Sequence, residues 1–471
     1  MNNRLDFSFT PNAINYSWRQ LALRAGIEDV PQKEADAQYC GVPLYYGFPE
    51  QIADKGKKIV VIPCKGRDWA ELVGKPAGRI DWVPAQAAFP EAAPLPFDHP
   101  IPVIFWGDAA RKGKFAECDG DTLVFHVDIL ATVFFMLSRW EEMDRTHDEE
   151  HGRFPASASV AHKQGFLDIP IVDIYGLLLR EWFKVIVPGW SPAPSQLRIN
   201  LTHDIDWIQH YSSVGQFARM AGGALLKRRN LGEFLNQFRH LYVQVTSPAR
   251  DGYIRSIYDL ADQSERHGLF SRFYVMAAEP SEYQEGYDPG TPWLWQCLEN
   301  LRQRGHEIGI HPGYSTLGNP ERLIGEKQRL EKALGESISG GRQHYLRFQV
   351  PSTWRHWEQA GLSYDSSLGY SERAGFRCGT CHPYHPFDIE LDAEMKIEEI
   401  PLIVMDVSLQ SYQRLSPAEG KSTILKLARR CAEVGGVFTL LWHNTSFSGE
   451  WLEWGRMYPD LLKDLAGMVK R

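Results

Sequence analysis

The sequence lacks any apolar run long enough to cross a membrane. A spanning helix needs roughly 18 or more consecutive apolar residues, and the best run, Ile129 to Leu137, is far shorter. The amino terminus has no basic segment followed by an apolar core, so no export signal is visible. We therefore expect a protein without a transmembrane segment that acts in the cytoplasm.

Positive charge and cysteine are also scarce. The 51 lysines and arginines are outnumbered by 59 acidic residues, which gives a net charge of −8. A nucleic-acid-binding surface needs the opposite sign, so we expect no nucleic-acid partner. The seven cysteines are scattered and odd in number, which indicates reduced thiols rather than a disulfide framework. No feature of the sequence indicates an oligomeric state.

The overall composition, with 43% hydrophobic and 23% charged residues, is typical of a globular protein. At about 150 residues per domain the length allows about three domains, and two large ones also fit. Three prolines, a glycine and several polar residues fall between Val187 and Gln196, which is typical of a linker. We predict two domains, residues 1–190 and 191–471.

The first predicted domain mixes short strands and helices. Lys58 to Ile62 and Pro102 to Trp106 have the apolar character of buried strands. Asp128 to Glu142 is expected to be a helix with Asp128 as its N-cap. This predicts a smaller mixed α/β domain.

The second predicted domain alternates strands and helices. Strands are expected at 197–202, 271–276, 306–311, 399–404 and 437–442, and helices at 254–267, 293–304, 353–360 and 417–434. This rhythm is typical of parallel α/β units, and about seven of them suit a distorted barrel better than an open sheet. An insertion, roughly Gln209 to Arg250, is rich in basic residues. It is either a solvated helical face or a docking surface for an acidic glycan or a membrane.

Three predicted strands end in polar residues that could carry chemistry. Asp204 and Asp206 are separated by one residue of a strand, so both side chains point the same way. The pair could be a metal ligand and a base, or it could cap the helix that follows. His311 ends another strand and could bind a metal, and His443 ends the last one and could act as a general acid. Carboxyl ends of barrel strands meet at one face, where active sites lie.

Taken in order, these segments resemble the polysaccharide deacetylases of the NodB-homology type, carbohydrate esterase family four. The segments are THDID (202–206), GHEIGIHPGYS (305–315), YDSSLGY (364–370), EIPLIVMD (399–406) and LLWH (440–443). In the first domain, FFMLSRWEE, HGRFP and GFLDIPIVD resemble a poorly characterised domain that precedes such deacetylase-like domains in bacterial proteins. The resemblance implies a NodB-like barrel and a hydrolase.

The resemblance also implies roles for individual residues. Asp204 would be the base, Asp206 and His311 ligands of a divalent metal such as zinc, and His443 the general acid. An arginine orients the base in this family, and here Arg342 or Arg347 could do so, with a slight preference for Arg342 from the spacing to Gly361. The family's second histidine ligand falls at Ser315, which is a poor zinc ligand. A water, His203, His443 or a carboxylate would have to replace it, or metal binding would be weakened.

Two functions follow from this resemblance. The first is a metal-dependent hydrolase that removes an N-acetyl group from an amino sugar of a bacterial surface glycan or its precursor. The alternative, motivated by Ser315, is a catalytically degenerate glycan-binding or assembly protein. In either case a carbohydrate is the expected partner, and the residues expected to contact it are Tyr314, Tyr345, Trp442 and Arg347.

Overall fold

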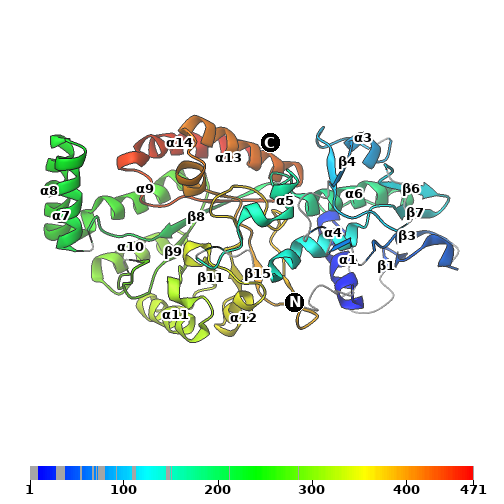
Figure 1. Ribbon diagram of the computed structural model, residues 1–471, viewed down its shortest axis with the longest axis horizontal. Coiled ribbons are helices and arrows are strands. Elements are labelled where there is room, and N and C mark those ends of the chain that lie inside the picture. The colour runs from blue at the N-terminus through cyan, green and yellow to red at the C-terminus, as the bar shows by residue number, and fades with distance from the viewer. Residues whose placement is uncertain are drawn as a thin grey trace.

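The protein consists of two parts that lie side by side (Figure 1). The computed structural model describes residues 9–27, 38–53, 56–65, 68–69, 72, 80–91, 93–108, 113–144, 149, 151–211, 213–284 and 286–469. Residues up to about Ile186 form the smaller part, and the barrel follows from Arg198. The predicted linker lies between these two positions. No helix in the described ranges is long and apolar enough to cross a membrane.

The smaller part is built on a mixed sheet with the strand order β1-β2-β3-β7-β6. Its strands are β1 (Gln38–Tyr39), β2 (Val42–Tyr46), β3 (Lys58–Val61), β6 (Ala116–Asp119) and β7 (Thr122–Phe125). A separate antiparallel pair is formed by β4 (Asp81–Val83) and β5 (Ile101–Val103), next to the short helix α3 (Ala85–Ala88). The predicted mixed α/β domain is therefore present.

Among the described residues, the longer helices of this part are α1 (Pro11–Ala25), α4 (Ile129–Leu137) and α6 (Ile171–Ile186). Asp128 caps α4 as predicted, because its carboxylate accepts a hydrogen bond from the Ala131 amide. The helix ends sooner than predicted. Arg139 adopts a left-handed backbone conformation with φ 53°, and a short 3₁₀ helix, η2 (Trp140–Met143), follows. The loop after η2 leads to η4 (Ala156–Ala158) and α5 (Val160–Lys163).

The larger part is a curled sheet of parallel strands, which confirms the predicted (β/α) barrel. The order is β15-β12-β11-β10-β9-β8-β17-β16. Its strands are β8 (Arg198–Ile205), β9 (Ser271–Val275), β10 (Glu307–Ile310), β11 (Gly340–Gly341), β12 (Tyr364–Asp365), β15 (Glu398–Glu399), β16 (Val404–Met405) and β17 (Val437–Leu441). The predicted strand at 399–404 is in fact split in two.

The split strand brings the two edges of the curled sheet together. β15 pairs with β12 at one edge, and β16, which begins at Val404 only a few residues later, pairs with β17 at the other. A single chain segment therefore reaches from one edge to the other. The segment that the sequence predicts as one strand thus contributes two strands, β15 and β16. The sheet therefore has eight strands where about seven units were expected.

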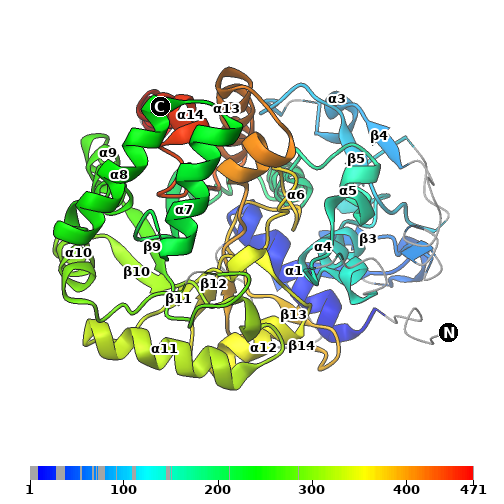
Figure 2. The same cartoon turned by 60° about the vertical axis from the view of Figure 1, so that its left-hand side comes forward.

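Helices cover the outside of the sheet. They are α9 (Gly252–Arg266), α10 (Pro292–Gln303), α11 (Pro320–Leu334), α12 (Ser352–Gln359), α13 (Pro417–Glu433) and α14 (Leu452–Val469). The basic insertion forms a separate hairpin made of α7 (Val214–Gly222), the π-helical turn η5 (Gly223–Lys227) and α8 (Leu231–Thr246). The hairpin stands at the end of the molecule opposite the smaller part (Figures 1 and 2).

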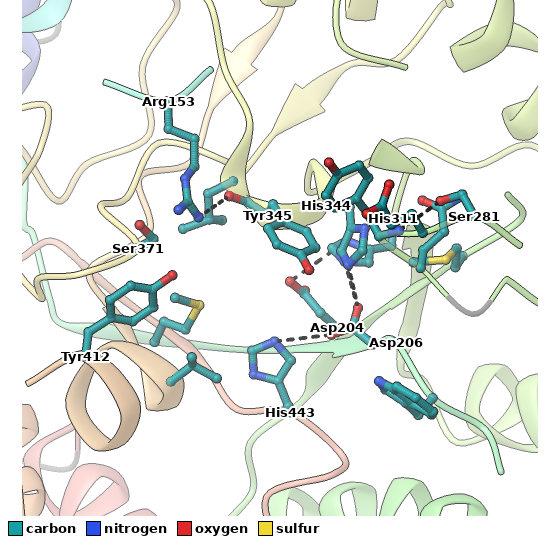
Figure 3. Close-up of a pocket in the computed structure, with 18 residues that line it drawn as sticks. Arg153, Asp204, Asp206, Ser281, His311, His344, Tyr345, Ser371, Tyr412 and His443 are labelled. Atoms are coloured by element: carbon teal, nitrogen blue, oxygen red, sulfur yellow. Dashed lines mark hydrogen bonds and ion pairs between the residues drawn. The ribbon is translucent and has the colours of Figure 1, made fainter. Parts of the chain in front are cut away.

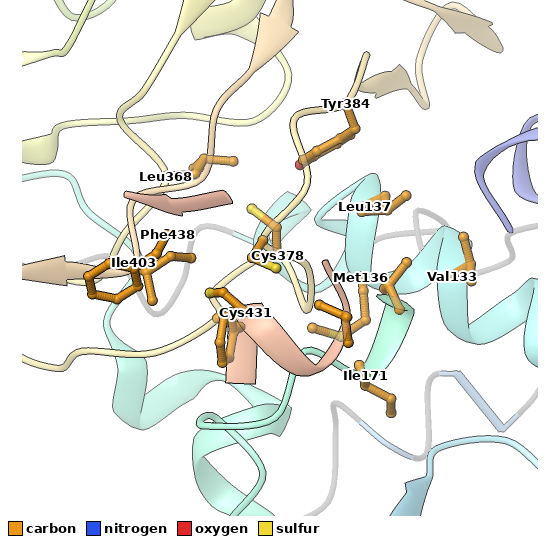
Figure 4. Packing of buried hydrophobic residues seen from close by; sticks show 14 of the residues in the cluster. Val133, Met136, Leu137, Ile171, Leu368, Cys378, Tyr384, Ile403, Cys431 and Phe438 are labelled. Carbon is orange, nitrogen blue, oxygen red and sulfur yellow. The ribbon is translucent and has the colours of Figure 1, made fainter. Parts of the chain in front are cut away.

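The two parts share one hydrophobic core. Met136 of α4 belongs to the same buried cluster as Cys378, Cys431 and Phe438 of the larger part (Figure 4). A buried ion pair crosses the same junction, because Arg377 donates two hydrogen bonds to Glu142, at 2.9 and 2.6 Å. Glu142 also accepts from Arg139 at 2.8 Å, so its single carboxylate lies between two buried guanidinium groups. The junction is thus packed like the interior of one protein.

Candidate active site

A cleft of about 410 Å³ opens at the carboxyl ends of the barrel strands (Figure 3). This volume lies within the range of about 300–1,000 Å³ that small-molecule sites occupy. Asp204 and Asp206 reach the cleft from the end of β8, His311 from the end of β10 and His443 from the end of β17. The motif residues that are distant in the sequence therefore meet at one site.

Asp204 is held by Arg342, which comes directly after β11. Arg342 Nη1 donates to Asp204 Oδ1 at 3.0 Å and to the Thr202 hydroxyl at 2.8 Å. Its other nitrogens donate to the carbonyl oxygen of Ser366 at 2.8 Å and to its hydroxyl at 2.9 Å. The guanidinium group is fully buried and has one orientation available. The Asp204 carboxylate is therefore paired with a buried guanidinium group that is itself held in place by hydrogen bonds.

Asp206 faces two histidines. Its Oδ1 atom lies 3.1 Å from His311 Nε2 and 3.6 Å from His344 Nε2. Burial raises the pKa of Asp206, but His311, His344 and His443 outweigh it, so the pKa is held well below its usual range. Burial lowers the pKa of His344 to about 3, which leaves its imidazole neutral. Asp206, His311 and His344 offer three ligand atoms within 4.8 Å of one another.

The donor chemistry of these three residues fits a divalent cation. His311 Nδ1 lies 2.7 Å from the Arg342 carbonyl oxygen, so it donates there and turns the lone pair of Nε2 toward Asp206. Asp206 Oδ1 and His344 Nδ1 are buried and have no hydrogen-bond partner among the described residues. A lone pair facing a carboxylate oxygen is stable only with a proton or a cation between them. Two imidazoles and one carboxylate are a common ligand set for zinc.

His443 is oriented by Asp406, which directly follows β16. Asp406 Oδ1 lies 2.7 Å from His443 Nδ1, and its Oδ2 accepts from the His443 amide and the Ser446 hydroxyl. Burial lowers the pKa of His443, but the ion pair with Asp406 outweighs it and raises this pKa to about 9. His443 Nε2 points into the cleft, 3.8 Å from Asp206 Oδ2. The pair can therefore hold a proton at Nε2 near neutral pH.

Aromatic side chains form one rim of the cleft. Tyr345 and Tyr283 line it, and each is more than a third exposed. Tyr314 lies behind Tyr283, with the two rings stacked at 4.0 Å. Arg347 covers the Tyr314 ring at 3.7 Å and donates to the carbonyl oxygens of His151 and Tyr314. Arg347 thus supports the rim and does not orient Asp204.

The smaller part of the protein contributes to this rim. Arg153, in the loop after η2, lines the cleft and donates to the Tyr345 carbonyl oxygen at 3.0 Å. It also pairs with Glu149. His151 lies 3.1 Å from the Tyr314 hydroxyl. Tyr345 has a left-handed backbone with φ 62°, a conformation that persists only where its surroundings impose it.

Three of the residues expected to contact substrate do not line the cleft. Trp442 was expected to contact substrate, but it is fully buried against Trp454 and Tyr458, on the side of β17 away from the cleft. Arg347 and Tyr314 were also expected to contact substrate, but neither is among the residues that line the cleft. Adjacent residues of a strand point to opposite faces, so placing His443 in the cleft sends Trp442 into the core.

His344, and not Ser315, lies beside Asp206 and His311, so His344 can offer the ligand atom that a serine at position 315 lacks. Ser315 is exposed and lies outside the cleft lining. His203, one of the substitutes considered, faces the other side of β8, where it contacts the Trp442 carbonyl oxygen and the Ser271 hydroxyl. His344 stands two residues after Arg342, and that spacing was the available signal. Asp406 and Arg153 were also missed, although both lie in segments that carry the resemblance.

A second group of metal-type ligands, Asp173, Cys381 and His382, lies at the junction of the two parts. Asp173 accepts hydrogen bonds from Arg24 Nε at 2.8 Å, from the Thr380 hydroxyl at 2.5 Å and from the Cys381 amide at 2.8 Å. His382 Nε2 lies 3.3 Å from the Val434 carbonyl oxygen. These groups satisfy one another, so we interpret the cluster as a structural junction.

Comparison with known proteins gives limited matches. A family of unknown function, DUF7033, matches residues 81–188. A comparison with curated proteins gives no match. The chain is similar to the crystal structure of a candidate polysaccharide deacetylase from Mycobacterium smegmatis, with 16% identity and a TM-score of 0.38, over 60% of this chain and 87% of that one. It is also similar to one from Pseudomonas aeruginosa PAO1, with 13% identity and a TM-score of 0.35, over 58% and 90%.

Proposed function

We propose that the protein is a metal-dependent hydrolase that removes the N-acetyl group from an amino sugar of a bacterial surface glycan or its precursor. The observation that carries the proposal is the single cleft in which an arginine-held carboxylate, a two-histidine and one-carboxylate ligand set, and an aspartate-held histidine face one another. These are the three kinds of group that hydrolysis of an amide needs.

Asp206, His311 and His344 would hold the metal ion, with zinc as the expected metal. A divalent cation supplies Lewis acidity toward a carbonyl oxygen and makes water more acidic. The hydrogen bond from His311 to the Arg342 carbonyl oxygen fixes His311 for this purpose. Arg342 therefore positions His311 through its backbone and Asp204 through its side chain.

Asp204 would take one proton from the attacking water as the oxygen of that water bonds to the acetyl carbon. Arg342 holds the Asp204 carboxylate in place at the cleft through its 3.0 Å hydrogen bond. His443 would then deliver the proton on Nε2 to the amide nitrogen as the bond between carbon and nitrogen breaks. The products are acetate and a free amino sugar, and the proton taken by Asp204 balances the one given by His443.

The degenerate, non-catalytic alternative was motivated by the serine at position 315. His344 offers the ligand atom that Ser315 lacks, so this motivation no longer applies. We therefore favour the hydrolase.

Acetate release is the direct test. The zinc-loaded protein is incubated with a panel of N-acetylated amino sugars and oligosaccharides, and acetate is measured. We expect release by the wild type and at least about a 100-fold slower release by Asp204→Asn, with unchanged metal content, because the base is lost but no ligand is. Equal release by Asp204→Asn would remove Asp204 as the base. A metal-loaded wild type that releases no acetate from any of the sugars would contradict the proposal.

A further inference from the structure

The hairpin formed by α7, η5 and α8, residues 214–246, presents an apolar stripe to solvent. Five side chains of α8 recur at alternating intervals of four and three residues, which places them on one side of the helix. They are Leu231, Leu235, Phe238, Tyr242 and Val245, and they are 48 to 72% exposed. Single exposed apolar residues are common on proteins, whereas a continuous row of this length marks a contact surface.

Two more exposed apolar side chains lie in the hairpin outside α8. Leu226, in the turn between the helices, is 80% exposed, and Val214 at the start of α7 is 82% exposed. The opposite side of α8 makes the internal contacts of the hairpin. Gln237 there is buried and its side-chain oxygen accepts from the Tyr211 hydroxyl at 2.6 Å. Of the stripe residues, Phe238 also packs edge-on against Phe217 of α7, with the ring centroids 5.1 Å apart, so the stripe is largely open to solvent but not wholly free of contacts within the hairpin.

The charge of the hairpin is opposite to that of the rest of the protein. Residues 214–246 contain five basic residues and one acidic residue, a net charge of +4, whereas the remaining 46 basic and 58 acidic residues carry −12. Lys227, Arg228 and Arg229 directly follow Leu226 at the tip. Arg239 lies one helical turn from both Leu235 and Tyr242. Positive charge thus flanks the apolar stripe.

Apolar side chains flanked by basic ones match the surface of an anionic lipid bilayer. Such a surface offers negative headgroups above an apolar layer, and amphipathic helices of this composition lie at that boundary. A nucleic acid or an acidic glycan would use the charge but leave the apolar stripe in water. Two copies of the hairpin could pair their stripes, but each brings a charge of +4 to the contact. We propose that the hairpin docks the protein on membranes that contain anionic lipids.

The hairpin joins the barrel at the edge of the cleft. It is inserted between β8, which carries Asp204, and α9. Asn444, the residue after His443, donates to the carbonyl oxygens of Trp207 at 2.8 Å and Tyr253 at 3.1 Å on either side of the insertion. A docked hairpin would therefore hold the cleft near the headgroups. If the proposed function is correct, this favours a substrate whose sugar is attached to a lipid; the docking itself does not depend on that function.

Vesicle flotation of the full chain tests the docking. Two kinds of vesicle are compared, phosphatidylcholine alone and equal parts of phosphatidylcholine and phosphatidylglycerol. We expect the protein to float only with the second kind, and less at high salt, because the headgroup attraction is screened. The triple variant Leu226→Gln, Leu235→Gln, Tyr242→Gln should lose at least about tenfold in binding, since it removes apolar side chains that the bilayer would bury. All three are exposed, so circular dichroism should show an unchanged fold.

Matched variants separate the contribution of the basic residues to membrane binding from those of the apolar stripe and of the active site. Lys227→Gln with Arg229→Gln should also weaken binding to the anionic vesicles about tenfold or more. Leu391→Gln replaces a leucine that is 67% exposed outside the hairpin and should bind like the wild type. Asp204→Asn should also bind like the wild type, so failure of the docking and failure of the hydrolase would be seen separately.

Three outcomes would overturn the docking proposal. One is no binding to anionic vesicles, and another is equal binding to neutral ones. The third is a wild type that is dimeric by light scattering, does not float with vesicles and becomes monomeric in the triple variant. That result would assign the stripe to contact between two copies of the chain.

Discussion

Asp406 Oδ1 lies 2.7 Å from His443 Nδ1, so the histidine that points into the cleft is fixed from behind by a fully buried carboxylate. Asp406 also accepts from the Ser446 hydroxyl at 2.6 Å and from the His443 amide at 2.9 Å. The two residues follow neighbouring parallel strands, β16 and β17, which bring their ends together. The ring nitrogen that faces the cleft, Nε2, is therefore the one free to give up a proton.

Asp406→Asn should lower kcat by about 100-fold or more, within the range that loss of a general acid costs. The amide has nearly the same shape but no charge, so it cannot stabilise a protonated His443. Metal content should not change, because Asp406 is not in the ligand set. Steady-state kinetics of the metal-loaded variant measure the effect. Ser446→Ala is the matched control, since it removes one hydrogen bond to Asp406 but keeps the charge, and it should cost less than about tenfold.

His344 is the proposed third metal ligand, and Ser315 occupies the position where the family resemblance would put a ligand. We expect His344→Ala to weaken zinc binding by at least about 100-fold, because loss even of a residue that only supports a ligand costs 10–100-fold. Asp206→Ala and His311→Ala should do the same. Elemental analysis after dialysis against metal-free buffer gives the occupancy. Ser315→Ala should keep the wild-type metal content because Ser315 is exposed. The reverse pattern, with metal lost in Ser315→Ala and kept in His344→Ala, would refute the ligand set.

Arg153 connects the smaller part of the protein to the cleft through the Tyr345 carbonyl oxygen at 3.0 Å. Arg153→Ala should lower kcat/KM about tenfold, because a hydrogen bond from a charged group contributes about 1.5–3 kcal/mol and its loss releases the backbone of Tyr345. Zinc content should stay at the wild-type level. Lys184→Ala on α6 removes a charge from the same part, far along the chain from the rim, and should leave the kinetics unchanged. Wild-type kinetics in Arg153→Ala would mean that the loop only covers the rim.

The sequence predicted those features of the site that depend on the regular alternation of strands. Asp204 and Asp206 share one face of the chain at the end of β8, and His311 and His443 end their strands as expected. His344 was missed because it lies in the short helix η8 (His344–Leu346), where the left-handed Tyr345 breaks any period. The partnership of Asp406 with His443 depends on which strands are neighbours, and Arg153 reaches the cleft only through packing of the two parts. Local patterns in one sequence carry neither kind of information.

The buried carboxyl groups of Asp365 and Glu399, on neighbouring strands β12 and β15, give the folded protein a pH dependence. Burial raises the pKa of both groups, and the neighbouring Asp365 raises that of Glu399 further. The folded pair therefore keeps a proton to higher pH than the unfolded chain, in which both groups have pKa values of about 4. Since the folded state binds more protons, this pair makes stability fall as pH rises, by up to about 1.4 kcal/mol per pH unit.

Glu399→Gln should remove this contribution, because the amide is neutral at every pH and can still donate to Asp365. The unfolding temperature of the variant relative to the wild type should therefore rise steadily between about pH 6 and pH 8, where the unfolded carboxyls are already ionised. At the acidic end the variant should be the less stable of the two, since a glutamine has only one oxygen for the two acceptor roles that Glu399 fills toward Trp354 and Leu368. Glu453→Gln, in a pair that is about two-thirds exposed, should show the same difference from the wild type at every pH. A Glu399→Gln difference that does not change with pH would mean that the folded pair is fully ionised, with Arg342 as the nearest compensating charge.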